Sequence, residues 1–184
     1  MGGSSIRRSL VASRRSSPRS AGRSSADGPA IAVAGRRQPL DAATVRRIAR
    51  AVLAGERARA RRVASLSFTF LGRDAMRDLN RIWKQHDSPT DVLSFALPDT
   101  AGRIVGDVYI CPWFAARAAR AAGVTPREEL IRLVVHGTLH VLGHDHPEGV
   151  DRERSAMWRR QEHYVAALVR RRSAGTRRPA TSDQ

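Results

Sequence analysis

The chain has 184 residues and a formal net charge of +16, which is enough length for one domain with a hydrophobic core but little for two. No apolar run approaches the roughly 20 residues that span a bilayer, which argues against an integral membrane protein. The single cysteine, Cys111, excludes an intrachain disulfide and a cysteine-built zinc site, and fits a reducing compartment.

Strands and helices are both predicted in the first part of the chain, whereas the last part is predicted to be helical. In chain order they are an edge strand at 30–34, a helix from its cap Asp41 to about residue 53, a strand at 65–71, a helix at 74–83, strands at 92–96 and 104–110, and helices at 112–122, 125–142 and about 150–170. About four strands and five helices predict an α+β fold, a single domain with a small mixed sheet.

Apolar spacing also predicts which side chains face the core. Met76, Leu79, Ile82 and Trp83 are expected on the inward face of their helix. Trp83, Trp113 and Trp158 are assigned to the core in preference to base stacking, since aromatics at helical spacing usually pack inside.

Both ends of the chain are predicted to be disordered basic tails. Residues 1–29 and 171–184 hold too little apolar material to offset the entropy of ordering. Their net charges are +5 and +3, which leaves +8 for the domain at 30–170 and favours a polyanionic partner such as nucleic acid. Two interpretations of residues 1–29 stay open: an organellar transit peptide, or an extension upstream of the true start.

Four of the six histidines fall within residues 136–146. Their helix has a clear start, because Thr125, Pro126 and Glu128 form a capping-box pattern, and Gly143 is placed to end it. His136 and His140 share one helix face, and the turn after Gly143 brings back a third imidazole, with His146 as the predicted ligand and His144 as the alternative.

Three imidazoles with an open fourth position are typical of a catalytic zinc site, although imidazole also suits nickel, copper and iron. A zincin peptidase would carry a glutamate directly after the first histidine, as its general base. Gly137 stands there, which argues against peptide hydrolysis. Asp145 is the candidate acid or base, with orientation of a ligand histidine as the alternative role.

The segment H-G-T-L-H-V-L-G-H-D-H at 136–146 closely resembles the signature of the YbeY family, bacterial endoribonucleases of rRNA maturation. Two further segments resemble the family, L-N-R at 79–81 with D-S-P-T-D-V-L-S-F at 87–95, and G-D-V-Y-I at 106–110. The resemblance implies an α+β fold, one zinc ion on His136, His140 and His146, and single-stranded rRNA precursors and the ribosome as partners.

The chain departs from the family pattern at two positions. His144 stands where the family usually has tyrosine. Lys84, the only lysine of the chain, stands where the family has a functionally important arginine. Lysine loses the bidentate fork of arginine but keeps the positive charge, which can still bind a phosphate. Lys84 is therefore predicted to act in catalysis and in phosphate binding. Asp91 and Ser94, in the turn and strand that resemble the family's segment, are predicted to bind substrate, with a buried structural role as the alternative for Asp91.

The sequence therefore predicts a metal-dependent endoribonuclease of rRNA maturation and ribosome quality control, in the bacterial cytoplasm and without a membrane partner. Two alternatives remain at this point. One is a metal-dependent hydrolase of another substrate, such as a peptide, and the other is a non-catalytic ribosome-associated factor that binds RNA.

Overall fold

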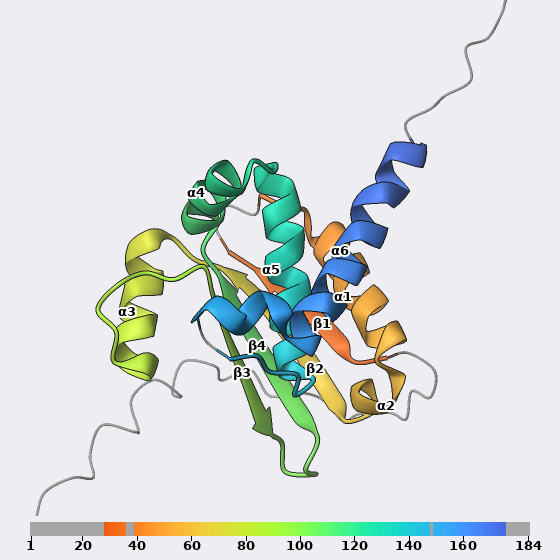
Figure 1. Ribbon diagram of the computed structural model, residues 1–184. Helices are drawn as coiled ribbons and strands as arrows, with labels where there is room; N and C mark the ends of the chain where they lie inside the picture. Colours follow the sequence, from red (N-terminus) through yellow and green to blue (C-terminus); the bar gives the residue numbers. More distant parts are fainter. Residues whose placement is uncertain (1–27, 36–38, 148, 176–184) are drawn as a thin grey trace, which may run out of the picture.

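The computed structural model describes residues 28–35, 39–147 and 149–175 (Figure 1). Its strands are β1 (Ala30–Ala34), β2 (Val63–Phe70), β3 (Val92–Pro98) and β4 (Ile104–Ile110). Its helices are α1 (Ala42–Gly55), α2 (Arg57–Ala60), α3 (Arg73–Lys84), α4 (Pro112–Ala122), α5 (Pro126–Val141) and α6 (Ala156–Gly175), with the 3-10 helix η1 (Gly149–Arg154) before α6.

The four strands form one mixed sheet in the order β1-β2-β4-β3. β1, β2 and β4 are parallel, whereas β3 pairs antiparallel with β4. The strand at 30–34 is an edge strand, as predicted. Alternation along β2 explains which face is covered, because Leu66 and Phe68 are buried while Ser65 and Ser67 are half-buried on the other face. This mixed sheet packed with helices confirms the α+β prediction.

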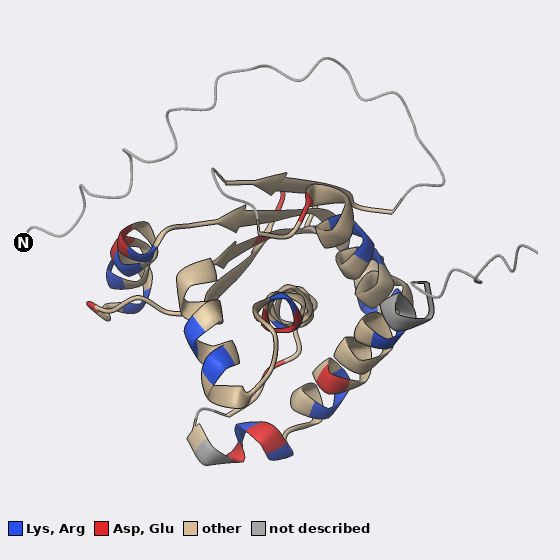
Figure 2. Ribbon diagram, turned by 90° about the horizontal axis from the view of Figure 1, so that it is seen from above, with Lys and Arg blue, Asp and Glu red and all other residues tan. Residues whose placement is uncertain are grey.

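The helices gather on one face of the sheet, with α3 beside its edge (Figure 2). Seen from above, α5 lies end-on in the middle and the other helices surround it. Its contacts are with β3 and β4 on one side and with α1, α4 and α6 on the others. A helix so placed is buried nearly all round: from Leu130 to Val141, every residue except Arg132 and His140 is buried.

Gly137 is what lets α5 approach the sheet closely. A Cβ atom at this position would overlap the side chain of Val108 on β4 and would come 3.2 Å from Oγ of Ser94 on β3. Packing therefore requires a glycine at this position, where a zincin peptidase would carry its glutamate. Close approach of α5 brings its histidines next to the β3 edge.

Several predicted details were wrong. Ile82 and Trp83 are 55% and 61% exposed, and Trp113 is 42% exposed, so the core assignment fails for all three. The helix α2 was not predicted, and the last helix continues to Gly175, beyond the predicted end at residue 170.

Most of the two predicted tails, residues 1–27 and 176–184, lies outside the described residues. Among the helices that the structure does describe, none is both long and apolar enough to cross a membrane.

Candidate metal centre

The site begins with α5, whose N-terminus is capped as the sequence predicts. The Thr125 hydroxyl accepts a hydrogen bond of 3.1 Å from the Glu128 backbone N–H, and Pro126 occupies the first turn. The helix then runs unbroken through His136 and His140. One turn separates these residues, and their Nε2 atoms lie 3.0 Å apart.

The third imidazole comes from the turn after α5. Gly143 adopts a left-handed conformation with φ of 78°, which reverses the chain at the predicted residue. His146 then lies beside the other two, and one ring nitrogen from each of His136, His140 and His146 lies within 4.8 Å of the others. Nε2 of His146 is buried and has no hydrogen-bond partner among the residues that the structure describes. A buried unpaired nitrogen aimed at two other imidazoles fits a metal ligand.

In two of the three rings, hydrogen bonds indicate which nitrogen is free to bind a metal. Nδ1 of His136 lies 2.7 Å from Oε1 of Gln161, and Nδ1 of His146 lies 2.9 Å from the carbonyl oxygen of Pro147. Both oxygens only accept, so each Nδ1 carries the hydrogen and each Nε2 keeps its lone pair. For His140 the nearest acid is Asp145, whose carboxylate lies 3.8 Å from Nδ1.

The protein environment keeps the rings of His136 and His140 neutral. Burial, followed by the neighbouring His140, lowers the pKa of His136 to about 3. Burial also lowers the pKa of His140, followed by the effect of His146. The nearby guanidinium of Arg152, on η1, contributes to both shifts. Neutral imidazoles are the form that binds a metal, so the cluster is suited to hold an ion near neutral pH.

A residue that the sequence analysis missed holds His136 in place. Gln161, on α6, is only 1% exposed, and its amide nitrogen donates a hydrogen bond of 2.9 Å to Glu162. Glu162 accepts from Arg132 of α5 at 2.9 Å. The helical spacing of Met157, Gln161 and Val165 gave the available signal, because it puts a polar amide on the buried face of α6.

His144, the alternative ligand, points elsewhere. Its Nε2 lies 3.0 Å from Oε2 of Glu56, a 7% exposed residue at the end of α1, and it is not part of the three-histidine cluster. Oε1 of Glu56 accepts hydrogen bonds from Arg160 and Tyr164 of α6. This carboxylate therefore ties α1, α6 and the exit turn of α5 together.

The cluster opens into a pocket of about 440 Å³. Lys84 from α3, Ser94 from β3 and Asp145 from the exit turn line it together with His136 and His140. Oγ of Ser94 is buried and, within the described part of the chain, has no hydrogen-bond partner. The Asp145 side chain is 88% exposed, and its Oδ1 accepts a hydrogen bond of 2.8 Å from the backbone N–H of His146.

Asp91 does not line this pocket. Its Oδ1 accepts hydrogen bonds from the Thr90 hydroxyl at 3.0 Å and from the Val92 backbone N–H at 2.8 Å. Its own carbonyl oxygen accepts from Cys111. These contacts hold the start of β3 in place.

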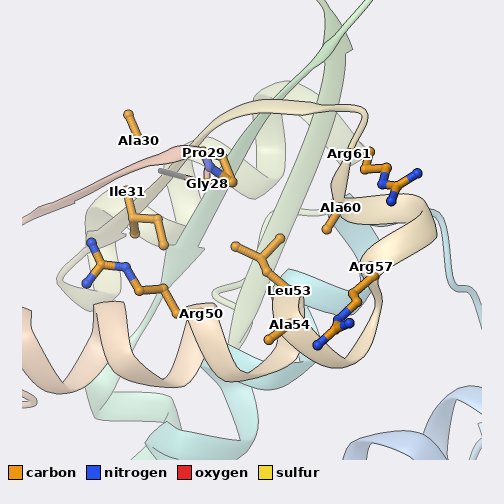
Figure 3. Close-up of a pocket in the computed structure, with 10 residues that line it drawn as sticks. All are labelled: Gly28, Pro29, Ala30, Ile31, Arg50, Leu53, Ala54, Arg57, Ala60 and Arg61. Atoms are coloured by element: carbon orange, nitrogen blue, oxygen red, sulfur yellow. The ribbon is translucent and has the colours of Figure 1, made fainter. Parts of the chain in front are cut away.

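A larger hollow, of about 980 Å³, lies beside the start of β1 and away from the histidines. Figure 3 shows the side chain of Leu53 between Arg50 on one side and Arg57 and Arg61 on the other. The residues that line it include no histidine, cysteine or carboxylate. The smaller pocket, which is lined by two members of the three-histidine cluster, is therefore the candidate site.

Comparison with known proteins gives consistent matches. The family described as "Endoribonuclease YbeY" matches residues 31–169. The endoribonuclease YbeY of Thermobifida fusca is 38% identical over 139 residues, covering 66% of this chain and 88% of that protein. Those of Sulfurihydrogenibium sp. and Aquifex aeolicus are 45% and 44% identical, over 44% and 51% of this chain and 55% and 63% of the relatives.

Proposed function

The chain belongs to the endoribonuclease YbeY family, and from this membership we propose that it cleaves phosphodiester bonds in single-stranded RNA. Its substrates would be rRNA precursors, in rRNA maturation and ribosome quality control, on or near the ribosome in the bacterial cytoplasm. The observation that carries the proposal is the convergence of His136, His140 and His146. The first two of these histidines line a pocket that Lys84 also lines.

The residues present fit a zinc ion. The cluster offers three nitrogen donors, one of which, Nε2 of His146, is buried without a partner among the described residues. Three histidines leave a fourth position open, as in catalytic zinc sites. When bound there, zinc would polarise a phosphoryl oxygen and lower the pKa of water.

Each remaining residue has a role that its position supports. Lys84 would bind the phosphate of the RNA backbone as a compact cation. Asp145, exposed at the open side of the pocket, would accept or donate a proton, while its contact with the His146 backbone holds the third ligand. Ser94 would donate its unpaired hydroxyl hydrogen to the substrate. Asp91 would support substrate binding by holding the first residues of β3 in place.

The test uses the full chain loaded with one equivalent of zinc and a labelled single-stranded RNA, with a duplex of the same sequence beside it. We expect cleavage of the single strand. His136→Ala should lose both metal and cleavage, whereas His163→Ala, at an exposed histidine of α6, should lose neither. Lys84→Ala should keep the metal and weaken cleavage, and Lys84→Arg should restore it.

Zinc-loaded wild-type protein that leaves single-stranded RNA intact would overturn the nuclease proposal. A metal-free protein that fails to fold, together with intact RNA, would instead indicate that the metal only stabilises the domain.

A further inference from the structure

Trp83 stands near the C-terminal end of α3 with 61% of its surface exposed. The inward face of α3 is formed by Met76 and Leu79, which pack with Leu93. Trp83 follows Met76 by two helical turns on that face, but there it meets only the edge of the sheet. Its indole contacts the ring of Phe95 on β3, with ring centroids 5.2 Å apart at an angle of 56°.

Phe95 joins this tryptophan to the metal pocket. It lines the same pocket as His136 and His140, and its ring also contacts Tyr109, with centroids 6.0 Å apart. Trp83 is therefore supported on one side by a half-buried aromatic ring and open on much of the rest of its surface. An exposed, supported indole at the rim of a polar pocket is a surface for a flat ligand.

The cation next to Trp83 is not used by another side chain. Along α3, three arginines pair with aspartates: Arg73 with Asp74, Arg77 with Asp87, and Arg81 with Asp78. Lys84 makes no ion pair or side-chain hydrogen bond with any residue that the structure describes. An open indole and an unpaired ammonium group on consecutive residues match the two parts of a nucleotide, its base and its phosphate.

We propose that Trp83 is a stacking site for one unpaired nucleobase of the RNA strand whose phosphate Lys84 binds. This inference rests on the proposed function. It adds a subsite that distinguishes unpaired RNA from paired RNA. Aromatic stacking tolerates all four bases, so the subsite selects by accessibility of the base and not by its identity.

The same geometry accounts for a preference for single strands. In a duplex, neighbouring base pairs cover both faces of each base, and stacking on Trp83 requires that the base first leaves the helix. In a single strand the base is already accessible. Trp83 therefore favours binding of unpaired RNA before any bond is cleaved.

A fluorescence titration tests the contact directly. Trp113→Phe and Trp158→Phe leave Trp83 as the only tryptophan in the chain. We expect a single-stranded RNA to quench this fluorescence in the zinc-loaded protein, and a duplex of the same sequence to quench it far less. Equal quenching by both, or none by the single strand while it binds, would overturn the proposal.

Affinity measurements separate stacking from folding. Trp83→Ala should weaken single-strand binding roughly tenfold to a hundredfold, and Trp83→Phe should keep most of the affinity because it keeps a ring. Trp113→Ala, at an exposed tryptophan of α4 outside the metal pocket, is the matched control and should bind as wild type. A single-stranded RNA that lacks one base should bind wild type as weakly as the intact strand binds Trp83→Ala, when the missing base is the one that stacks. The same abasic strand should bind Trp83→Ala no more weakly than the intact strand does.

The outcomes distinguish the two proposals. Wild-type protein that neither binds nor cleaves single-stranded RNA would overturn the function. Wild-type cleavage together with full single-strand affinity in Trp83→Ala would overturn only the stacking subsite.

Discussion

The imidazole of His144 lies 3.0 Å from the carboxylate of Glu56, 88 residues earlier in the chain, and not among the three clustered histidines. Glu56 is buried at the end of α1, and Arg59, just beyond it, donates hydrogen bonds to the carbonyl oxygens of Leu142 and Gly143. The start of the exit turn is thus fixed from α1 and α2, and this turn goes on to carry His146 to the site.

His144→Ala is therefore expected to keep one metal ion per chain, whereas His146→Ala should lose most of its metal affinity. His144 contributes a hydrogen bond to Glu56, so its loss should cost stability of about 1 kcal/mol. Metal content after gel filtration and thermal unfolding check both points. Loss of the ion from His144→Ala with retained metal in His146→Ala would reverse the assignment of the third ligand.

Glu56 is expected to make the domain sensitive to acid. Burial alone would raise the pKa of Glu56, but hydrogen bonds from Arg160, His144 and Tyr164 outweigh it and hold the pKa below the ordinary value of 4.5. A lowered folded-state pKa stabilises the protein above the unfolded value, and this contribution disappears as the pH falls through the folded-state pKa.

Glu56→Gln should then lower the free energy of unfolding by about 1–3 kcal/mol near neutral pH. It should also flatten the fall of stability below the ordinary carboxyl pKa, as urea unfolding at a series of pH values would record. Glu162, whose pKa is also lowered, stays as a second source of acid sensitivity in the variant. A pH profile parallel to that of wild type would contradict the role of Glu56.

Gln161 is expected to tune metal affinity without being a ligand. Its Oε1 accepts the Nδ1 hydrogen of His136 and so presents Nε2 to the ion. Gln161→Leu, of similar size, should weaken zinc binding about tenfold to a hundredfold in competition with a chelator. Gln161→Glu keeps an acceptor and should keep more of the affinity. Unchanged affinity in the leucine variant would show that His136 needs no such partner.

Gly137→Ala is expected to destabilise the domain through packing. The added methyl group meets Val108, so α5 must move from the sheet or Val108 must change its rotamer. A cost of about 1–3 kcal/mol is typical of such overpacking. Val108→Ala in the same chain should recover part of it, and a double-mutant cycle on unfolding free energies measures the coupling. Strict additivity of the two changes would place the strain elsewhere.

Most of the helices and strands, and the histidine cluster, could be predicted from the sequence alone. Local rules were sufficient, because capping at Thr125 and reversal at Gly143 depend on the residues immediately around them. Helix geometry alone places His136 and His140 on one face. Because few residues separate His140 from His146 in the sequence, the turn between them can follow few paths.

The contacts that those residues make depend on how the helices pack in three dimensions. Only the docking of α6 against α5 brings Gln161 to His136, and only the packing of α1 turns His144 toward Glu56. Trp83 has the spacing of a core residue, but α3 lies beside the edge of the sheet, and the described elements leave the indole 61% exposed. Periodicity reports which face of a helix is apolar, whereas the extent of the neighbouring layer, set by long-range packing, decides whether that face is buried.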